Sequence, residues 1–188
     1  MSKAWFITST SKGFGRIWTE AALERGGRVA ATARDARSLD ALVERYGDQI
    51  LPLALDVTDK AAVDAAVKAA HERFGRLDVV VNNAGYGLFG ALWVTKAALP
   101  ILREQGSGHI IQVSSIGGVN AFPTLGLYHA SKWGLEGFSQ ALAAEVPASG
   151  STSRSSSRPA TRPTGPARRR SRPTGCPPTT RSASSARG

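Results

Sequence analysis

Short apolar runs alternate with stretches of helical periodicity over the first 146 residues of the chain. One helical stretch, Arg37–Tyr46, places Leu39, Leu42 and Val43 on a single face, whereas the runs on either side of it are short enough to be buried strands. Because strands and helices alternate, the pattern predicts βαβ units and a doubly wound parallel sheet of the α/β class.

The pattern predicts ten elements in this region. The strands are expected at Ala4–Thr8, Arg28–Ala33, Ile50–Leu55, Leu77–Val81 and His109–Val113. The helices are expected at about Gly15–Arg25, Arg37–Tyr46, Ala61–Phe74, Trp93–Leu102 and Tyr128–Val146. The sheet therefore has about five strands, and residues 1–146 form the one folded domain.

The composition changes at Pro147. Residues 147–188 contain no Val, Ile, Leu, Phe, Trp or Tyr, so they cannot bury enough apolar surface to offset the entropy of ordering them. The same segment carries nine Arg and no acidic residue, and it accounts for nearly all of the net charge of +10. We expect a disordered Ser/Arg/Pro-rich tail behind a nearly neutral domain, which argues against a specific nucleic-acid partner.

The remaining composition favours a cytoplasmic protein without a membrane span. No run of about eighteen apolar residues occurs, and the first residues lack a secretory cleavage site. A single Cys excludes an internal disulfide and suits a reducing compartment. No Cys, His and carboxylate spacing suggests a metal site.

A glycine-bearing turn follows the first strand and opens a helix, which is where a nucleotide pyrophosphate binds in such folds. Its candidate cofactor-binding residues are Thr8, Thr10, Ser11, Lys12, Gly13, Phe14 and Gly15. The competing interpretation is an ordinary glycine turn. Arg34 ends the second strand and, with Lys12, favours the 2′-phosphate of NADP. Asp35 comes next, and it would favour NAD if its side chain rather than that of Arg34 pointed inward.

Tyr128 and Lys132 are spaced by one helical turn, so their side chains share a face. An ammonium beside a phenol stabilises the phenolate, which makes the pair suitable for acid/base work. Ser115 lies at the end of the fifth strand, with Ser114 as its register alternative. His129 is expected to be exposed.

Together these segments resemble the short-chain dehydrogenase/reductase family, through a TGxxxGxG-like turn, Asn82-Asn83-Ala84-Gly85, a serine after strand five and Tyr-x-x-x-Lys. The resemblance implies a Rossmann-like fold, an enzyme that moves hydride between NADP(H) and a secondary alcohol or ketone, and a homo-oligomer. It implies catalytic roles for Ser115, Tyr128 and Lys132, with Lys132 and Tyr128 also at the cofactor. It adds Asp56, Val57, Asn83, Ala84 and Gly85 to the cofactor site, although Asp56 could instead be a helix N-cap.

Three departures from the family pattern predict a damaged copy. Ser9 replaces the first glycine of the turn, so cofactor binding should be weakened. Gly87 stands where the family has a relay Asn, and the residues between Gly85 and this point are too few. We interpret this as an in-frame deletion between two GLFGA-like repeats. A one-base shift of the possible codons of residues 149–166 permits FGINVTLVEPAGYATDWA, which resembles the family's strand six, so we interpret the tail as a frameshift.

Activity of this copy is therefore doubtful. The alternative function is that of a non-catalytic dinucleotide-binding remnant or interaction protein.

Overall fold

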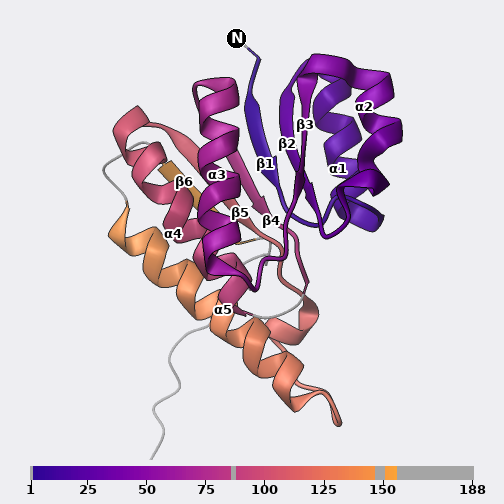
Figure 1. The fold of residues 1–188 in the computed structure, drawn as a ribbon. Coiled ribbons are helices and arrows are strands. Elements are labelled where there is room, and N and C mark those ends of the chain that lie inside the picture. Colours follow the sequence, from indigo (N-terminus) through magenta and orange to yellow (C-terminus); the bar gives the residue numbers. More distant parts are fainter. Residues whose placement is uncertain (1, 86–87, 147–150, 156–188) are drawn as a thin grey trace, which may run out of the picture. The chain divides into compact units, whose positions relative to one another are not determined.

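The computed structural model describes residues 2–85, 88–146 and 151–155. Six parallel strands form one sheet in the order β3-β2-β1-β4-β5-β6 (Figure 1). They are β1 (Ala4–Ile7), β2 (Arg28–Ala33), β3 (Ile50–Ala54), β4 (Val79–Asn82), β5 (Gly108–Gln112) and β6 (Ser151–Ser155). The strand order reverses between β1 and β4, and ligands of such sheets bind at the carboxyl ends of the strands beside this point. The predicted Rossmann-like α/β fold is confirmed.

Helices lie on both faces of the sheet (Figure 1). They are α1 (Gly13–Glu24), α2 (Asp40–Tyr46), α3 (Lys60–Phe74), α4 (Leu88–Gln105) and α5 (Gly126–Glu145), with short 3₁₀ turns η1 (Ala36–Leu39), η2 (Gly47–Gln49) and η3 (Ile116–Gly118). Each helix predicted from the sequence is found. The largest difference is α4, which begins five residues earlier than expected, close behind β4.

Two apolar clusters hold these layers together, and alternate residues of the strands supply them. Phe6 and Val80 join the cluster under α3, α4 and α5, which includes Val67 and Leu102. Their neighbours along the strands, such as Ile7, join the cluster under α1 and α2. The strands are apolar on both faces because both faces are covered, as is usual for parallel sheets.

The strand β6 corrects the expectation of a tail without structure from residue 147 onward. Residues Ser151–Ser155 pair in parallel with β5, from Gly108 opposite Ser151 to Gln112 opposite Ser155. The composition argument concerned side-chain burial, whereas the free edge of β5 binds a neighbouring strand through backbone N–H and C=O groups, which every residue except proline supplies in full. The rest of the predicted tail, residues 156–188, lies outside the described residues.

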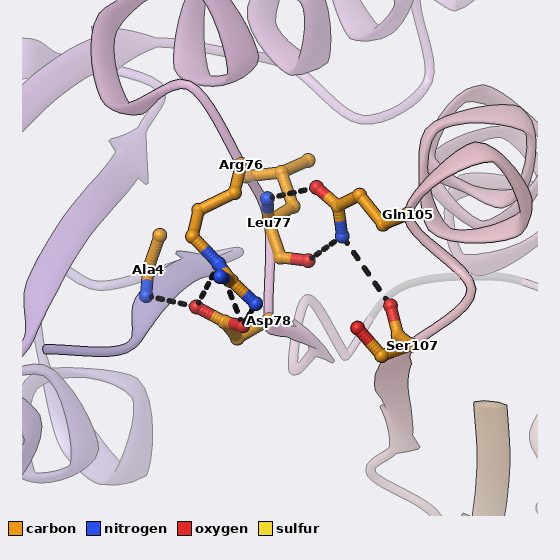
Figure 2. Close-up of polar contacts among 6 residues, drawn as sticks. All are labelled: Ala4, Arg76, Leu77, Asp78, Gln105 and Ser107. Carbon is orange, nitrogen blue, oxygen red and sulfur yellow. Dashed lines mark hydrogen bonds and ion pairs between the residues drawn. The ribbon is translucent and has the colours of Figure 1, made fainter. Parts of the chain in front are cut away.

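A polar cluster joins β1, β4 and α4 at the opposite end of the sheet from the strand carboxyl ends (Figure 2). Asp78 accepts a hydrogen bond from the backbone amide of Ala4 (2.8 Å) and forms an ion pair with Arg76. Gln105, the last residue of α4, accepts from the amide of Leu77 (2.8 Å) and donates to its carbonyl oxygen (2.6 Å). This reciprocal pair fixes the end of α4 to the start of β4.

Candidate functional site

The turn between β1 and α1 is anchored to a strand on each side. Thr10 donates its amide and its hydroxyl to the carbonyl oxygen of Thr32 at 2.8 and 3.1 Å. On the other side, the amide of Thr8 donates to Val81 O at 3.0 Å. Lys12 precedes the first residue of α1 and its side chain makes no capping bond. The first amides of α1 are thus left for an anionic group, as the sequence predicted for this turn.

Ser9 has a φ of +59°, in the left-handed region that favours glycine. A Cβ in that region crowds the following carbonyl oxygen and costs about 1–2 kcal/mol. The structure therefore supplies a physical reason why a glycine is expected at this position of the turn. Replacing it by serine leaves the path of the chain intact but adds strain to it.

Gly15 allows α1 to approach the turn closely. A Cβ on Gly15 would lie 2.1 Å from Ser9 O and 2.6 Å from Asn83 Nδ2, which is closer than such atoms can come. Asn83 Nδ2 in turn donates to Thr8 O and Ser9 O at 3.0 and 3.1 Å. The turn, the start of α1 and the end of β4 are therefore packed backbone to backbone, and only glycine fits at residue 15.

A cleft of about 220 Å³ opens at the carboxyl ends of the strands. Most of its lining belongs to the cofactor residues predicted from the sequence; the lining residues are Ser9, Ser11, Lys12, Ala33, Arg34, Leu55, Asp56, Val57, Thr58, Ala84 and Gly85. Segments far apart in the sequence thus meet at one place. Among the other predicted residues, Thr8, Thr10, Gly13, Gly15 and Asn83 build the turn beside the cleft, and Phe14 is 67% exposed and stacks on Trp18.

Arg34 and Asp35 differ in what they contact. Arg34 lines the cleft, as does Lys12. The carboxylate of Asp35 accepts hydrogen bonds from the backbone amide and the guanidinium of Arg37, at 2.9 to 3.1 Å, and caps η1. These bonds with Arg37 lower the pKa of Asp35. The acidic side chain is thus held by Arg37, and the basic one is available to a ligand in the cleft.

Asp56 is held by the turn that follows β3. Its Oδ1 accepts from the amide and the hydroxyl of Thr58 at 2.9 and 2.8 Å. These two bonds, together with the charge of Arg34, lower the pKa of Asp56. The alternative role as helix N-cap belongs instead to Asp59, whose side chain accepts from the amide of Ala62 at the start of α3. Asp56 is therefore an ionised group on the wall of the cleft.

Tyr128 and Lys132 share one face of α5, as their spacing predicted. Lys132 is only 8% exposed, whereas Tyr128 is 39% exposed. Lys132 Nζ lies 5.9 Å from the centre of the Tyr128 ring and donates to the carbonyl oxygen of Val113 at 3.3 Å. The ammonium is thus held beneath the phenol, between α5 and the end of β5.

Gly117 links Ser115 to the surroundings of Tyr128. Ser115 Oγ accepts from the amide of Gly117 at 3.2 Å. A Cβ on Gly117 would lie 2.8 Å from Cε1 of the Tyr128 ring. The alternative, Ser114, has a buried hydroxyl oxygen for which the described residues offer no hydrogen-bond partner. Ser115 is thus the serine that is tied to the segment packed on Tyr128.

His129 is buried, and the expectation that it would be exposed is wrong. It is 6% exposed, and its ring accepts from Phe122 N at 2.8 Å and contacts Gly117 O at 2.9 Å. The helical geometry that turns His129 away from its neighbours on α5 turns it towards the segment between β5 and α5. Sequence spacing shows the direction of a side chain on its own helix but not what a distant segment brings against it.

Comparison with known proteins decides the family. The family profile described as short chain dehydrogenase matches residues 3–89 and 86–152. The chain belongs to the short-chain dehydrogenase family. Oxidoreductase BOA17 of Botryotinia fuckeliana is 48% identical to it over 167 positions, which cover 78% of this chain and 61% of that protein. A short-chain dehydrogenase structure from Streptomyces avermitilis matches with a TM-score of 0.79 and 38% identity, covering 82% of this chain and 64% of that one.

A metagenomic short-chain oxidoreductase solved in complex with NADP also matches, with a TM-score of 0.77 and 27% identity, covering 82% of this chain and 81% of that one. This short-chain dehydrogenase chain spans about three fifths of the length of BOA17. The two segments of the profile match overlap at residues 86–89 of this chain. Since 78% of the 188 residues is about 147, the alignment with BOA17 contains about twenty positions at which this chain has no residue.

The sequence analysis of this short-chain dehydrogenase missed a buried polar network behind the site. Asn82 Nδ2 donates to Gln112 Oε1 (3.0 Å) and to Thr95 Oγ1 (3.1 Å), and Gln112 Nε2 donates to Thr95 Oγ1 (3.0 Å). The network ties β4 and β5 to α4 beneath the strand ends. A polar residue in an apolar run, such as Thr95, was the signal that could have indicated it.

Within the described ranges, no group of three His, Cys, Asp or Glu could hold a metal ion. The same part of the chain contains no helix that is long and apolar enough to cross a membrane.

Proposed function

We propose that this chain is a copy of an NADP-dependent oxidoreductase that moves hydride between the cofactor and a secondary alcohol or ketone. The observation that carries the proposal is that Tyr128 lies directly above a buried Lys132 and beside the segment that holds Ser115. These residues lie at the carboxyl ends of the strands, the end of the sheet at which the nucleotide cleft opens.

The residues of the cleft fit a dinucleotide with a 2′-phosphate. Lys12 and Arg34 supply positive charge to the cleft, whereas the carboxylate of Asp35 is occupied by Arg37. Guanidinium groups bind phosphate through two parallel hydrogen bonds. The amides at the start of α1, which no side chain caps, suit a pyrophosphate. The charges therefore favour NADP over NAD.

The reaction requires proton movement at one oxygen of the substrate. When bound, the nicotinamide supplies or accepts the hydride at the carbon that carries this oxygen. In reduction, the Tyr128 hydroxyl donates its proton to that oxygen; in oxidation, the phenolate accepts it. Lys132 stabilises the phenolate through its positive charge. Ser115 Oγ accepts from the Gly117 amide, so its own proton is available to the substrate oxygen.

We further propose that a segment has been lost between β4 and α4. The overlap of the two profile segments at residues 86–89 is what a deletion between two similar repeats would leave. Gly87, where the family has its relay Asn, lies outside the described residues. Without that Asn, Lys132 lacks one partner in proton transfer, and we expect turnover well below that of an intact relative.

A second candidate is a dinucleotide-binding protein without catalysis. It is favoured by the short span of the chain, which covers about 61% of BOA17. In this case the cleft would bind NADPH, but no substrate would be reduced.

NADPH fluorescence titration and a carbonyl-reduction assay distinguish these functions. The full chain should be compared with a version in which the missing segment and reading frame are restored, and each with its Tyr128→Phe variant. The oxidoreductase proposal expects NADPH binding by both chains and turnover that Tyr128→Phe abolishes. If both chains bind NADPH and neither reduces a carbonyl substrate, the second candidate is supported. If neither chain binds NADPH, both functions are contradicted.

A further inference from the structure

His129 is buried on α5 next to Tyr128, and both of its ring nitrogens contact the segment between β5 and α5. Nδ1 lies 2.9 Å from the carbonyl oxygen of Gly117, and Nε2 accepts from the amide of Phe122 at 2.8 Å. The Phe122 and Tyr128 rings lie 5.6 and 5.9 Å from the imidazole, measured between ring centres. One side chain therefore holds two points of this segment, five residues apart.

The chemistry of these partners determines where the proton of the imidazole lies. A carbonyl oxygen can only accept a hydrogen bond, so Nδ1 must carry a hydrogen. A backbone amide can only donate, so Nε2 must be bare. His129 is therefore a neutral imidazole with its proton on Nδ1.

The contacts of His129 continue to the proposed catalytic residues. Gly117 accepts from His129 through its carbonyl oxygen and donates its amide to Ser115 Oγ at 3.2 Å. The same residue packs so tightly that an added Cβ would lie 2.8 Å from Tyr128 Cε1 and 2.9 Å from His129 Nδ1. The position of Ser115 relative to Tyr128 is thus set through Gly117, and Gly117 is held by His129.

Beyond the buried glycines Gly117 and Gly118, which pack against α5, the segment is exposed. Residues 119–128 are all exposed, and the hydrogen bonds of Val119 and Asn120 run back to Ile116 within the same segment. Exposed backbone with few packed side chains opens readily unless a buried group ties it down. The bond from Phe122 to His129 ties the middle of the segment to α5.

We propose that His129 is a positioning residue that locks residues 116–122 onto α5 and so holds Ser115 at the distance from Tyr128 that the reaction requires. The effect on the reaction rests on the proposed function. The two hydrogen bonds of His129 with Gly117 and Phe122, called the lock below, can be observed without cofactor or substrate.

The first test is the protonation of the imidazole in the full chain, measured by NMR of ¹⁵N-labelled histidine. The spectrum should show His129 with a protonated Nδ1 and a bare Nε2; its signals are those missing from the His129→Phe variant. The second test is amide hydrogen exchange. His129→Phe keeps the ring but removes both bonds, so the amides of Gly117 and Phe122 should exchange about tenfold faster.

Two partial replacements and one control separate positioning from a merely structural role. His129→Asn can still reach Gly117, and His129→Gln can still reach Phe122, so each should restore protection at its own partner. Leu127→Ala, at a side chain that is 91% exposed, should change nothing. With turnover measured in the same variants, His129→Phe should lower kcat about tenfold and leave the Kd for NADPH unchanged.

A proton on Nε2, or equal exchange rates in the wild type and His129→Phe, would overturn the lock. If His129→Phe does not fold, the proposal is still tested by the imidazole spectrum of the wild type and by amide exchange in His129→Asn and His129→Gln. A chain with the expected imidazole that fails to bind NADPH would contradict the proposed function and leave the lock standing. The opposite result, NADPH binding with a proton on Nε2, would contradict the lock alone.

Discussion

Thr8 and Asn83 are joined by reciprocal hydrogen bonds, although 75 positions separate them in the chain. Thr8 Oγ1 accepts from the amide of Asn83 at 2.9 Å and from that of Ala84 at 3.0 Å, while Asn83 Nδ2 donates to Thr8 O at 3.0 Å. The two strand ends that border the cleft are thereby held together through groups that are largely withdrawn from water.

Replacing Thr8 by valine should lower the free energy of unfolding by about 2 kcal/mol, because two amides lose their acceptor while the shape of the side chain is kept. Urea unfolding followed by circular dichroism measures the change. Thr8→Ser keeps the hydroxyl and should lose less than half as much. Equal losses in the two variants would show that packing of the methyl group, rather than the hydrogen bonds, matters at this position.

Gly15 and Gly137 form a matched pair for testing the close packing of the turn. A Cβ at Gly15 would overlap Ser9 O, so Gly15→Ala should cost about 1–3 kcal/mol of stability and weaken NADPH binding. A Cβ at Gly137, an exposed residue within α5, would meet no atom within 4 Å, so Gly137→Ala should add up to about 1 kcal/mol. A neutral effect of Gly15→Ala would mean that α1 can move away from the turn.

Ser9→Gly should stabilise the chain. It removes left-handed strain of about 1–2 kcal/mol and adds somewhat less than 1 kcal/mol of chain entropy to the unfolded state, so a net gain of roughly 0.5–1 kcal/mol is expected. The apparent melting temperature should rise and the Kd for NADPH should fall. Ser9→Ala keeps the Cβ and should show neither effect. An equal gain in stability in Ser9→Ala would show that the serine hydroxyl, and not the left-handed backbone, destabilises the turn.

Arg34→Ala should raise the Kd for NADPH about tenfold or more, because a charge-assisted contact with the 2′-phosphate is lost. The Kd for NADH, which lacks that phosphate, should change less than twofold. Fluorescence titration with each cofactor measures the ratio. Arg45→Ala is the control, since Arg45 pairs with Glu24 and does not line the cleft. If Arg34→Ala raises the Kd for NADPH and the Kd for NADH by the same factor, Arg34 does not recognise the 2′-phosphate.

Acid should destabilise the chain partly through Asp56. The hydrogen bonds from the Thr58 amide and hydroxyl, and the charge of Arg34, lower the pKa of Asp56 in the folded state. A lowered folded pKa stabilises the protein above the unfolded value of about 3.9, and this contribution is lost as the pH falls through the folded pKa. The urea midpoint should therefore fall less between pH 5 and pH 3 in Asp56→Asn than in the wild type. Parallel curves would contradict this linkage.

Most of the fold could be predicted because periodicity and glycine positions are local signals. The strand Arg28–Ala33 was predicted at its observed bounds, and each other predicted element of residues 1–146 was found with ends shifted by up to five residues. The candidate cofactor residues of the turn and Arg34 followed from their places at strand ends, whereas Asp56, Val57, Asn83, Ala84 and Gly85 were added by the resemblance to the family.

The misses share one cause, which is that the deciding contact comes from a distant segment or from the backbone. His129 was expected at the surface because its spacing on α5 contains no information on Gly117 or Phe122. The strand Ser151–Ser155 was not expected because its side chains give no strand signal, whereas its pairing uses backbone groups.

The bond between Gln105 and Leu77 affects how this chain can tolerate a shortened connection. These bonds hold the carboxyl end of α4 to the start of β4 independently of the chain that enters the helix at its other end. A shortened connection before α4 therefore leaves this anchoring point of the helix unchanged.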